Sequence, residues 1–286
     1  MKYAISIINL MALMPLPLLY LIADFILYPI IRYVVRYRRN VVEKNLALAF
    51  PEKTYTERLS IEKSFYHYIC DFLVETIKLH RMDKKELAQR FVWDNIEEIT
   101  ANDGEFKINL CLTAHYSNWE WAICNLIPTA HSGSLFVYQP LRNRLLNEWI
   151  CKNRSKFGAM PVEMHSVSKV LQSLHSDFKT YTIIIGADQR PKEEYVKHFH
   201  RFMGIKTKVI TGTEQLINRF GMNVYYCEIK RIKRGRYQCT PHLITVADYD
   251  STLSEWPYTD CYFDKLQEQI QCNPEQWLWS HDRWKR

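Results

Sequence analysis

The chain has 286 residues, of which 47% are hydrophobic and 24% are charged, and its formal net charge is +7. This composition excludes a disordered chain and allows one sizeable core. The basic excess favours an anionic partner such as a phospholipid surface, a phosphorylated substrate or an acidic carrier protein. The eight cysteines show no zinc-ligand spacing, and several lie within apolar runs, so we expect reduced core thiols rather than a disulfide framework.

The N-terminal segment predicts membrane attachment. Between residues 4 and 31 the only ionised side chain is Asp24. A helix of this length rises about 42 Å, more than the roughly 30 Å hydrocarbon core of a bilayer, which disfavours a buried core helix. Three prolines weaken the case for one straight helix, so a bent helix and a hairpin that dips into one leaflet both fit the sequence. The basic residues that follow, Arg32, Arg36, Arg38, Arg39 and Lys44, predict that the rest of the chain lies in the cytosol.

Beyond this anchor, strand-like and helix-like segments alternate. A helix is expected from Thr54, whose side chain forms a capping box with Glu57, to about His80. The apolar run at residues 108–114 predicts a buried strand. Further strands are expected at residues 134–138, 160–164, 181–186, 223–229 and 236–246, and helices at 142–157, 167–174, 214–220 and 257–271. The alternation predicts an α/β fold, a mixed sheet flanked by helices, with an anchor at 1–35 and one cytosolic domain at 36–286.

The residues with the clearest chemistry are His115 and Glu120. His115 directly follows the expected strand at 108–114, and in open α/β sheets ligands gather beyond the carboxyl ends of strands. A carboxylate that faces an imidazole raises its basicity, so that it can take the proton of a hydroxyl attacking an activated carbonyl. The spacing alone is weak, because a histidine and a glutamate five residues apart arise often by chance. A structural histidine in a strand-end turn is the alternative.

Residues 115–120, HYSNWE, carry a resemblance to a known family. They resemble the His-x4-Asp/Glu motif of the glycerolipid and lysophospholipid acyltransferase superfamily, and in particular its lipid A biosynthesis (lauroyl and myristoyl) acyltransferase branch. Other blocks are similar to that branch in the same order along nearly the whole chain. They are residues 37–39 (YRR), 45–46 (NL), 50–51 (FP), 138–141 (YQPL) with Asn143, Arg154 before Gly158, 186–189 (GADQ) and 274–285 (PEQWLWSHDRWK).

The resemblance implies an enzyme that transfers an acyl chain from an acyl thioester to a lipid hydroxyl, with no metal and no cofactor. It implies His115 as the general base and Glu120 as its partner. Arg154 would contact the donor thioester or an acceptor phosphate, since a guanidinium stays charged and offers a planar fork of donors. Asp188 and Gln189 match a strand-end pair that shapes the site. The substrate-binding residues implied are Arg154, Asn118, Asp188, Gln189 and Tyr138.

The resemblance also implies the partners and the location. The donor would be acyl carrier protein or acyl-coenzyme A, and the acceptor a lipid, with no nucleic acid involved. The enzyme would serve lipopolysaccharide synthesis at the cytosolic side of the inner membrane of a Gram-negative bacterium.

Two departures from the family pattern matter. Ser117 stands where members often have glycine, and Gln139 stands where a basic residue commonly follows the tyrosine. Gln139 leaves the acceptor open between a lipid A precursor and a lysophospholipid or lyso-aminolipid. A non-catalytic lipid-binding protein of the same fold and a metal-dependent lipid hydrolase are the alternatives from other classes.

Four further residues have plain structural interpretations. Glu75 lies among apolar neighbours on a predicted helix, where a structural hydrogen bond is expected. His198 and His200 flank Phe199 in what reads as a basic loop, and a metal site there would need a nearby pair of carboxylates. His281, in the tryptophan-rich tail, is expected to pack or to contact the membrane.

Overall fold

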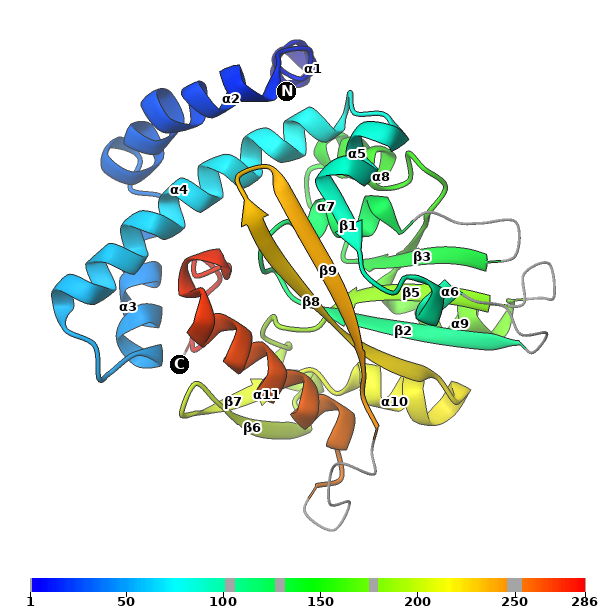
Figure 1. Ribbon diagram of the computed structural model, residues 1–286. Coiled ribbons are helices and arrows are strands. Elements are labelled where there is room, and N and C mark those ends of the chain that lie inside the picture. The colour runs from blue at the N-terminus through cyan, green and yellow to red at the C-terminus, as the bar shows by residue number, and fades with distance from the viewer. Residues whose placement is uncertain (1, 101–105, 127–131, 175–179, 246–253, 286) are drawn as a thin grey trace.

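A computed structural model describes residues 2–100, 106–126, 132–174, 180–245 and 254–285 (Figure 1). Its centre is a seven-stranded mixed sheet in the order β1-β9-β8-β2-β5-β3-β4. Only β8 and β9 pair antiparallel within it, and the other neighbours are parallel. The strands are β1 Phe91–Trp93, β2 Lys107–Thr113, β3 Ser132–Tyr138, β4 Met160–Glu163, β5 Thr180–Gly186, β8 Asn223–Lys233 and β9 Arg236–Leu243. Helices flank the sheet, so the predicted α/β class is confirmed.

The two central strands β2 and β5 run in register. Thr113 at the end of β2 lies opposite Gly186 at the end of β5. Nearly all residues of both strands are buried. Each strand has a neighbouring strand on either side, which explains their apolar sequences. Cys111 in β2 is a buried free thiol, as its apolar surroundings predict. The residues that follow the two strands therefore emerge side by side at one edge of the sheet.

The longest helix, α4 Tyr55–Leu79, begins as predicted. Thr54 accepts from the backbone of Glu57, and the Glu57 carboxylate accepts from the backbone of Thr54, which completes the capping box. The other helices are α3 Arg39–Ala49, α5 Lys84–Arg90, α6 Glu97–Thr100, α7 Trp119–Asn125, α8 Arg144–Arg154, α9 Val167–Gln172, α10 Gly212–Phe220 and α11 Pro257–Cys272. The last residue of the strand expected at 236–246 lies outside the described residues.

The N-terminal segment is bent. Helix α1 Lys2–Met11 is separated by a turn at Pro15 from α2 Leu16–Ile22, which continues through π-helical turns at Ala23–Leu27 and Ile30–Val34. Helix α2 and its continuation lie along α4, whereas α1 crosses near one end of it (Figure 1). The stretch Leu16–Val34 is long and apolar enough to cross a membrane, and it exposes large side chains such as Phe25 (75%) and Val34 (76%).

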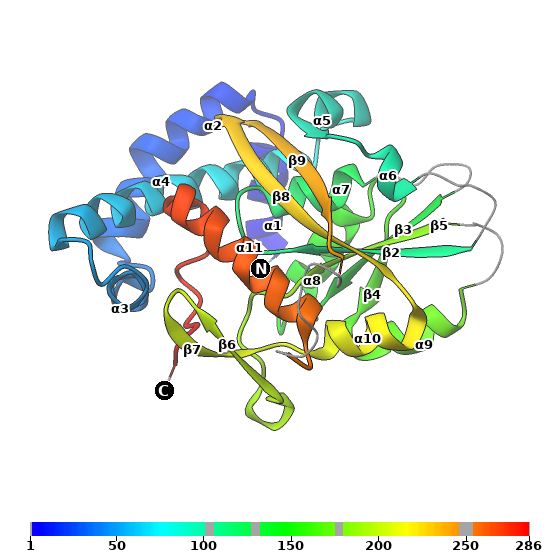
Figure 2. The same cartoon turned by 60° about the horizontal axis from the view of Figure 1, so that its bottom comes forward.

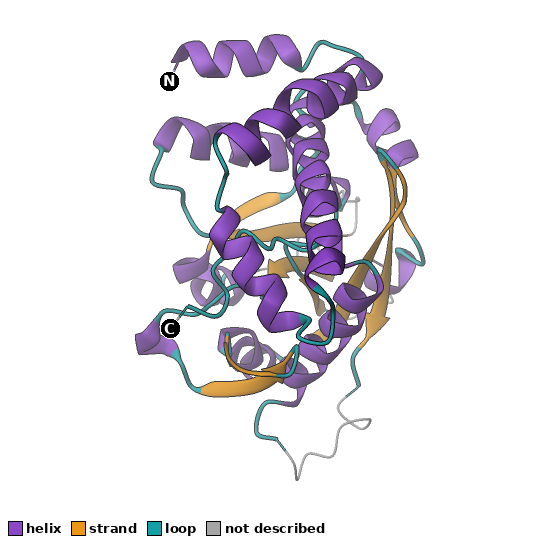
Figure 3. Cartoon of the chain, turned by 90° about the vertical axis from the view of Figure 1, so that its left-hand side faces the viewer, coloured by secondary structure: helices purple, strands orange, loops and turns teal. Residues whose placement is uncertain are grey.

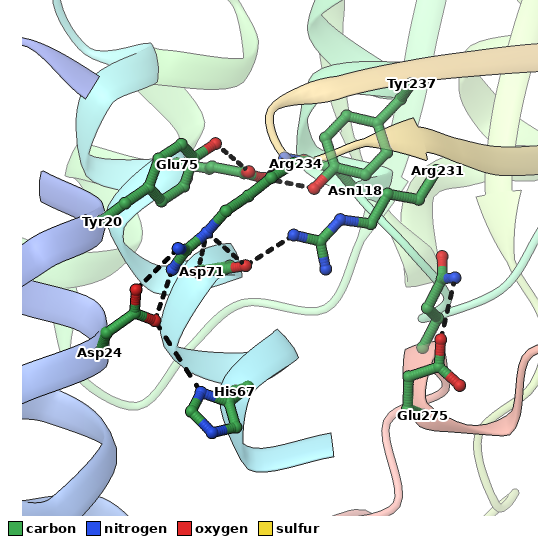
Figure 4. Close-up of polar contacts among 11 residues, drawn as sticks. Tyr20, Asp24, His67, Asp71, Glu75, Asn118, Arg231, Arg234, Tyr237 and Glu275 are labelled. Carbon is green, nitrogen blue, oxygen red and sulfur yellow. Dashed lines mark hydrogen bonds and ion pairs between the residues drawn. The ribbon is translucent and has the colours of Figure 1, made fainter. Parts of the chain in front are cut away.

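Polar contacts fasten this segment to the rest of the chain (Figure 4). Asp24 pairs with Arg234 of the β8–β9 turn at 2.7 Å, and Arg234 also contacts Asp71 of α4. Arg32 pairs with Glu62 of α4 at 2.7 Å, and both side chains are buried. Breaking a buried pair by removing one partner costs about 3–5 kcal/mol, so these contacts hold the N-terminal segment against α4.

A second, two-stranded sheet is formed by β6 His198–Phe202 and β7 Ile205–Val209. The sequence analysis placed residues 198–200 in a loop, and that expectation was wrong. Met203 and Gly204 both have positive φ, 52° and 74°, which suits the tight turn that joins two antiparallel strands. The hairpin lies beside α11 (Figure 2), at the end of the molecule opposite the N-terminal helices (Figure 3).

Candidate active site

The site lies at the carboxyl ends of three neighbouring parallel strands. His115 follows β2, Asp188 and Gln189 follow β5, and Tyr138 ends β3. In the sheet these strands are adjacent, in the order β2-β5-β3. The topology therefore brings together residues that are up to 74 positions apart in sequence, at the edge where open α/β sheets bind ligands.

His115 and Asp188 form a direct pair. The Nδ1 atom of His115 lies 2.7 Å from Oδ1 of Asp188, and the other carboxylate oxygen accepts from Nε1 of Trp277 at 2.9 Å. An ionised carboxylate only accepts, so the neutral imidazole carries its proton on Nδ1. The amide nitrogen of Gln189 lies 3.2 Å from Nε2 and donates to its lone pair. His115 therefore presents an unprotonated Nε2 on a side chain that is 27% exposed.

The environment keeps Asp188 ionised. Burial by itself raises the pKa of this carboxyl. His115, through its charge when the ring is protonated and through its hydrogen bond, outweighs burial together with the bond from Trp277, and the pKa lies below its ordinary value. The Asp188 side chain is only 3% exposed. It is thus a buried anion whose donors fix it in place.

Gly186 lies directly beside the imidazole of His115. A Cβ added at Gly186 would lie 3.4 Å from Cε1 and 3.7 Å from Nδ1 of His115. At these distances a methyl group would be in ordinary van der Waals contact with the ring, so the imidazole packs directly over the backbone at the end of β5.

The C-terminal tail completes the support of the His115 turn. The backbone N–H of Leu278 donates to the carbonyl of His115 at 3.0 Å, and that of Ser117 donates to the carbonyl of Gln276 at 2.9 Å. His281 accepts from the backbone N–H of Arg190 through Nε2 at 3.0 Å, and burial lowers its pKa to about 4. His281 therefore packs as a neutral acceptor. The contact of Trp277 with Asp188 was not predicted, although the tryptophan-rich tail is visible in the sequence.

Glu120 was expected to pair with His115, but its ion pair is with Arg154. It lies in the first turn of α7 and forms a two-pronged pair with Arg154 of α8, at 2.8 Å to Nε and 2.5 Å to NH2. It also accepts from Nε1 of Trp119 at 3.2 Å. Helices α7 and α8 lie so that the Glu120 carboxylate contacts Arg154. The ends of β2 and β5 lie in register, so Asp188 contacts the imidazole of His115 instead. A catalytic role for Glu120 stays a prediction.

The Glu120–Arg154 pair is buried and charged. Burial opposes the charge on Glu120, but Arg154, and to a smaller extent His115, lower the pKa of the carboxyl. The pKa of Arg154 is raised by Glu120 against the effect of burial. A planar guanidinium is thus held rigidly near His115, at the end of α8.

Asn118 and Ser117 shape the turn between His115 and α7. Asn118 is buried and caps α7: its Oδ1 accepts from the backbone of Trp121 at 3.0 Å, and its Nδ2 donates to Glu75 at 2.6 Å (Figure 4). A substrate contact by Asn118 stays a prediction. Ser117 has φ +53°, which explains why glycine suits this position, since the left-handed region is costly for other residues. Its buried Oγ has no hydrogen-bond partner among the described residues.

Tyr138 ends β3 with a half-buried ring. Its hydroxyl lies 3.5 Å from the Glu163 carboxylate at the end of the neighbouring strand β4. The structure therefore places Tyr138 at the same edge of the sheet as His115, while direct contact with a substrate stays a prediction.

A basic surface adjoins this edge. An open groove of about 480 Å³ is lined by Arg38, Arg190, Pro191, Lys192, Glu193, His281, Asp282 and Lys285. A second groove of about 590 Å³ shares Arg38 with it and is also lined by Arg36, Arg39, Asn40, Val41 and Glu43. Arg190 directly follows Gln189, which contacts His115, so a basic groove begins next to the imidazole. Such a surface attracts anionic groups such as phosphates.

Comparison with known proteins identifies the family of the chain. A sequence search against curated proteins returned no match. A family model described as bacterial lipid A biosynthesis acyltransferase matches residues 2–286, which is nearly the whole chain. The match spans the N-terminal helices, the strand-end site and the C-terminal tail alike. The chain belongs to the bacterial lipid A biosynthesis acyltransferase family and is an acyltransferase enzyme.

Proposed function

We propose that the protein transfers a fatty acyl chain from an acyl thioester to a hydroxyl group of a phosphorylated lipid A precursor, with His115 as the general base. The observation that carries this proposal is the His115–Asp188 pair, which leaves Nε2 unprotonated and partly exposed. Acyl carrier protein and acyl-coenzyme A are both suitable donors, because each presents its acyl chain as a thioester.

In the proposed reaction, Nε2 of His115 takes the hydroxyl proton as the acceptor oxygen attacks the thioester carbonyl. The new C–O bond forms, the C–S bond breaks, and the thiolate leaves with the proton from the imidazolium. Asp188 holds the ring and stabilises its positive charge. Such general-base help contributes about 10²–10⁴-fold in rate. Arg154, held by Glu120, supplies positive charge for the thioester oxygen or for an acceptor phosphate.

The basic grooves favour a phosphorylated acceptor. Arg38, Arg190, Lys192 and Lys285 line the groove that starts beside Gln189. Within it, Glu193 is paired with both Arg190 and Lys208, and Asp282 is paired with Lys44, so both acidic side chains already have cationic partners. A lysophospholipid typically carries one phosphate group, whereas two basic grooves that share Arg38 suit an acceptor with more anionic charge.

The N-terminal segment is proposed to lie in one leaflet of the inner membrane, with the domain on the cytosolic side. Its apolar side chains, such as Phe25 and Val34, face outward, while Asp24 and Arg32 turn inward to ion pairs with the domain. A segment fastened along its length to α4 suits a helix in the membrane interface better than one that crosses alone.

The test is acyl transfer by the full-length protein in detergent. Acyl carrier protein thioesters and coenzyme A thioesters are offered with a phosphorylated lipid A precursor, its dephosphorylated form or a lysophospholipid. We expect transfer to the phosphorylated precursor, and a loss of about 10²–10⁴-fold in His115→Ala. His242→Ala is the matched control, because His242 also pairs with a carboxylate, Glu228, but lies on the β8–β9 hairpin.

Equal activity in His115→Ala and His242→Ala would contradict the proposed chemistry. Preference for the lysophospholipid would retain the chemistry and replace the acceptor. No transfer to any of these lipids would overturn the proposed donor and acceptor.

A further inference from the structure

Two histidines and two aspartates meet where the β6–β7 hairpin lies against α11. His198 and His200 are two residues apart on β6, so their side chains leave the same face of the strand, while Phe199 between them leaves the other. Asp260 and Asp264 are four residues apart on α11, so they too share a face. These four residues are distinct from the site around His115.

The distances place three metal-binding atoms together. Oδ1 of Asp260 lies 2.7 Å from Nε2 of His198 and 2.9 Å from Nδ1 of His200. All three residues are largely buried, with side-chain exposures between 12% and 21%. Their ligand atoms lie within 4.8 Å of one another. Ligands of a tetrahedral zinc ion are separated by about 3.3–3.5 Å, so small shifts of the side chains would admit the ion.

Asp264 adds a second carboxylate to the cluster, and this carboxylate orients His200. Its Oδ1 lies 2.9 Å from Nε2 of His200, the ring nitrogen that faces away from Asp260. Histidines that bind metals donate their other ring N–H to a carboxylate or carbonyl, which fixes the tautomer and raises the basicity of the ligand. The pair of carboxylates that the sequence analysis required near His198 and His200 is therefore present.

We infer that His198, His200 and Asp260 bind one zinc ion, or a similar first-row divalent metal, with Asp264 orienting His200. The donor set of two imidazoles and one carboxylate suits zinc, with a fourth position for water. The ion replaces the protons that the imidazoles share with Asp260, so binding releases protons.

The position of the cluster indicates a structural role. On α11, Tyr262 donates to the carbonyl of Thr113, the last residue of β2, at 2.8 Å. At the end of β6, Phe202 contacts Trp277, whose indole donates to Asp188. A metal that joins β6 to α11 would clamp the two elements that support the strand end and the tail behind His115.

The test strips metal from the full-length protein in detergent with EDTA, removes the EDTA and then measures the binding of zinc that is added back. We expect one zinc per chain by elemental analysis, and a Tm that rises with zinc concentration, by roughly 5–10 °C at a hundredfold excess over Kd. Cobalt, used as a spectroscopic probe, should show tetrahedral d–d bands without a thiolate charge-transfer band. Binding with thiolate bands would overturn the assignment, because the metal would then sit on cysteines.

Three variants assign the ligands. Asp260→Asn and His200→Ala should abolish binding, and Asp264→Asn should weaken it about 10–100-fold. His242→Ala, whose imidazole pairs with Glu228 outside the cluster, should bind as the wild type does. If a ligand variant fails to fold, the stoichiometry and the cobalt spectrum of the wild-type protein still decide. No zinc bound by the folded, EDTA-treated wild type, or undiminished binding by a folded His200→Ala, overturns the inference.

Discussion

Asp188 and Glu75 are both fully buried carboxylates near the His115 turn, but their partners differ in kind. Asp188 faces an imidazole that can carry positive charge, and its pKa is lowered. Glu75 accepts from the hydroxyls of Tyr20 and Tyr237 and from the amide of Asn118 (Figure 4). Burial raises the pKa of Glu75, because the hydrogen bonds from its neutral donors do not outweigh it. One carboxylate is prepared to stabilise a charge that forms during a reaction, and the other holds the scaffold behind it.

The largest effect is expected from Asp188→Asn. An amide in place of the carboxylate removes the negative charge beside the imidazolium and no longer fixes the proton on Nδ1. Acyl transfer should fall about 10²–10⁴-fold with little change in KM, measured by steady-state kinetics. Asp94→Asn, whose carboxylate accepts from Thr240 outside the site, should keep wild-type activity. Retained activity in Asp188→Asn would assign the orientation of His115 to another group.

The second-largest effect is expected from breaking the Glu120–Arg154 pair, and it is an effect on stability. Arg154→Met leaves Glu120 buried without its cation, which should cost about 3–5 kcal/mol in the free energy of unfolding. Adding Glu120→Gln should recover part of this loss, because the charge left unpaired is then gone. The control is Arg144→Met, since the exposed pair of Arg144 with Glu148 is worth about 0.3–0.5 kcal/mol. Equal losses in Arg154→Met and Arg144→Met would show that burial does not strengthen the Arg154 pair.

The comparison of Asp188 with Glu75 predicts opposite responses to pH. The lowered pKa of Asp188 contributes stability above the unfolded value of 3.8, which is lost as the pH falls through the folded value. The raised pKa of Glu75 does the reverse: stability is lost as the pH rises from the unfolded value of 4.5 through the folded one. Relative to wild type, Asp188→Asn should therefore be most destabilised at neutral pH, by about 1–3 kcal/mol.

Glu75→Gln should instead gain on the wild type as the pH rises, because it mimics the protonated carboxyl. Both variants are measured by chemical unfolding between about pH 2 and 8, because the Asp188 contribution is lost only below the unfolded value of 3.8. The same direction of change in the two variants would remove the distinction between the carboxylates.

The smallest effect is expected at Ser117. Glycine there relieves a positive φ and removes a buried hydroxyl that has no partner among the described residues, against a greater entropy loss on folding. Ser117→Gly should raise Tm by about 2–4 °C, which corresponds to roughly 1 kcal/mol. Ser155→Gly, at φ −84°, should give no such gain. A lower Tm in Ser117→Gly would mean that the hydroxyl is bound, for instance by water.

Local patterns predicted much of this fold. The capping box at Thr54 located α4, and the apolar runs located β2 and β5, because burial and backbone hydrogen bonding act over a few residues. The placement of His115 and Asp188 after strands was likewise visible. What spacing did not reveal was their pairing, because it depends on β2 and β5 lying next to each other in the sheet. The cluster around His198 could not be predicted for the same reason, since its aspartates lie on α11, some sixty residues later in the sequence.

The central claim is that Asp188 holds His115 in the tautomer whose Nε2 carries no proton, so that an acceptor hydroxyl can replace the Gln189 amide at this atom. The most direct measurement is ¹⁵N NMR of histidine side chains in the full-length protein, with the His115 signals assigned by their loss in His115→Ala. The account predicts that the neutral imidazole of His115 carries its proton on Nδ1, and that Asp188→Asn disturbs this preference. A proton on Nε2 of the neutral ring, unchanged by Asp188→Asn, would contradict it.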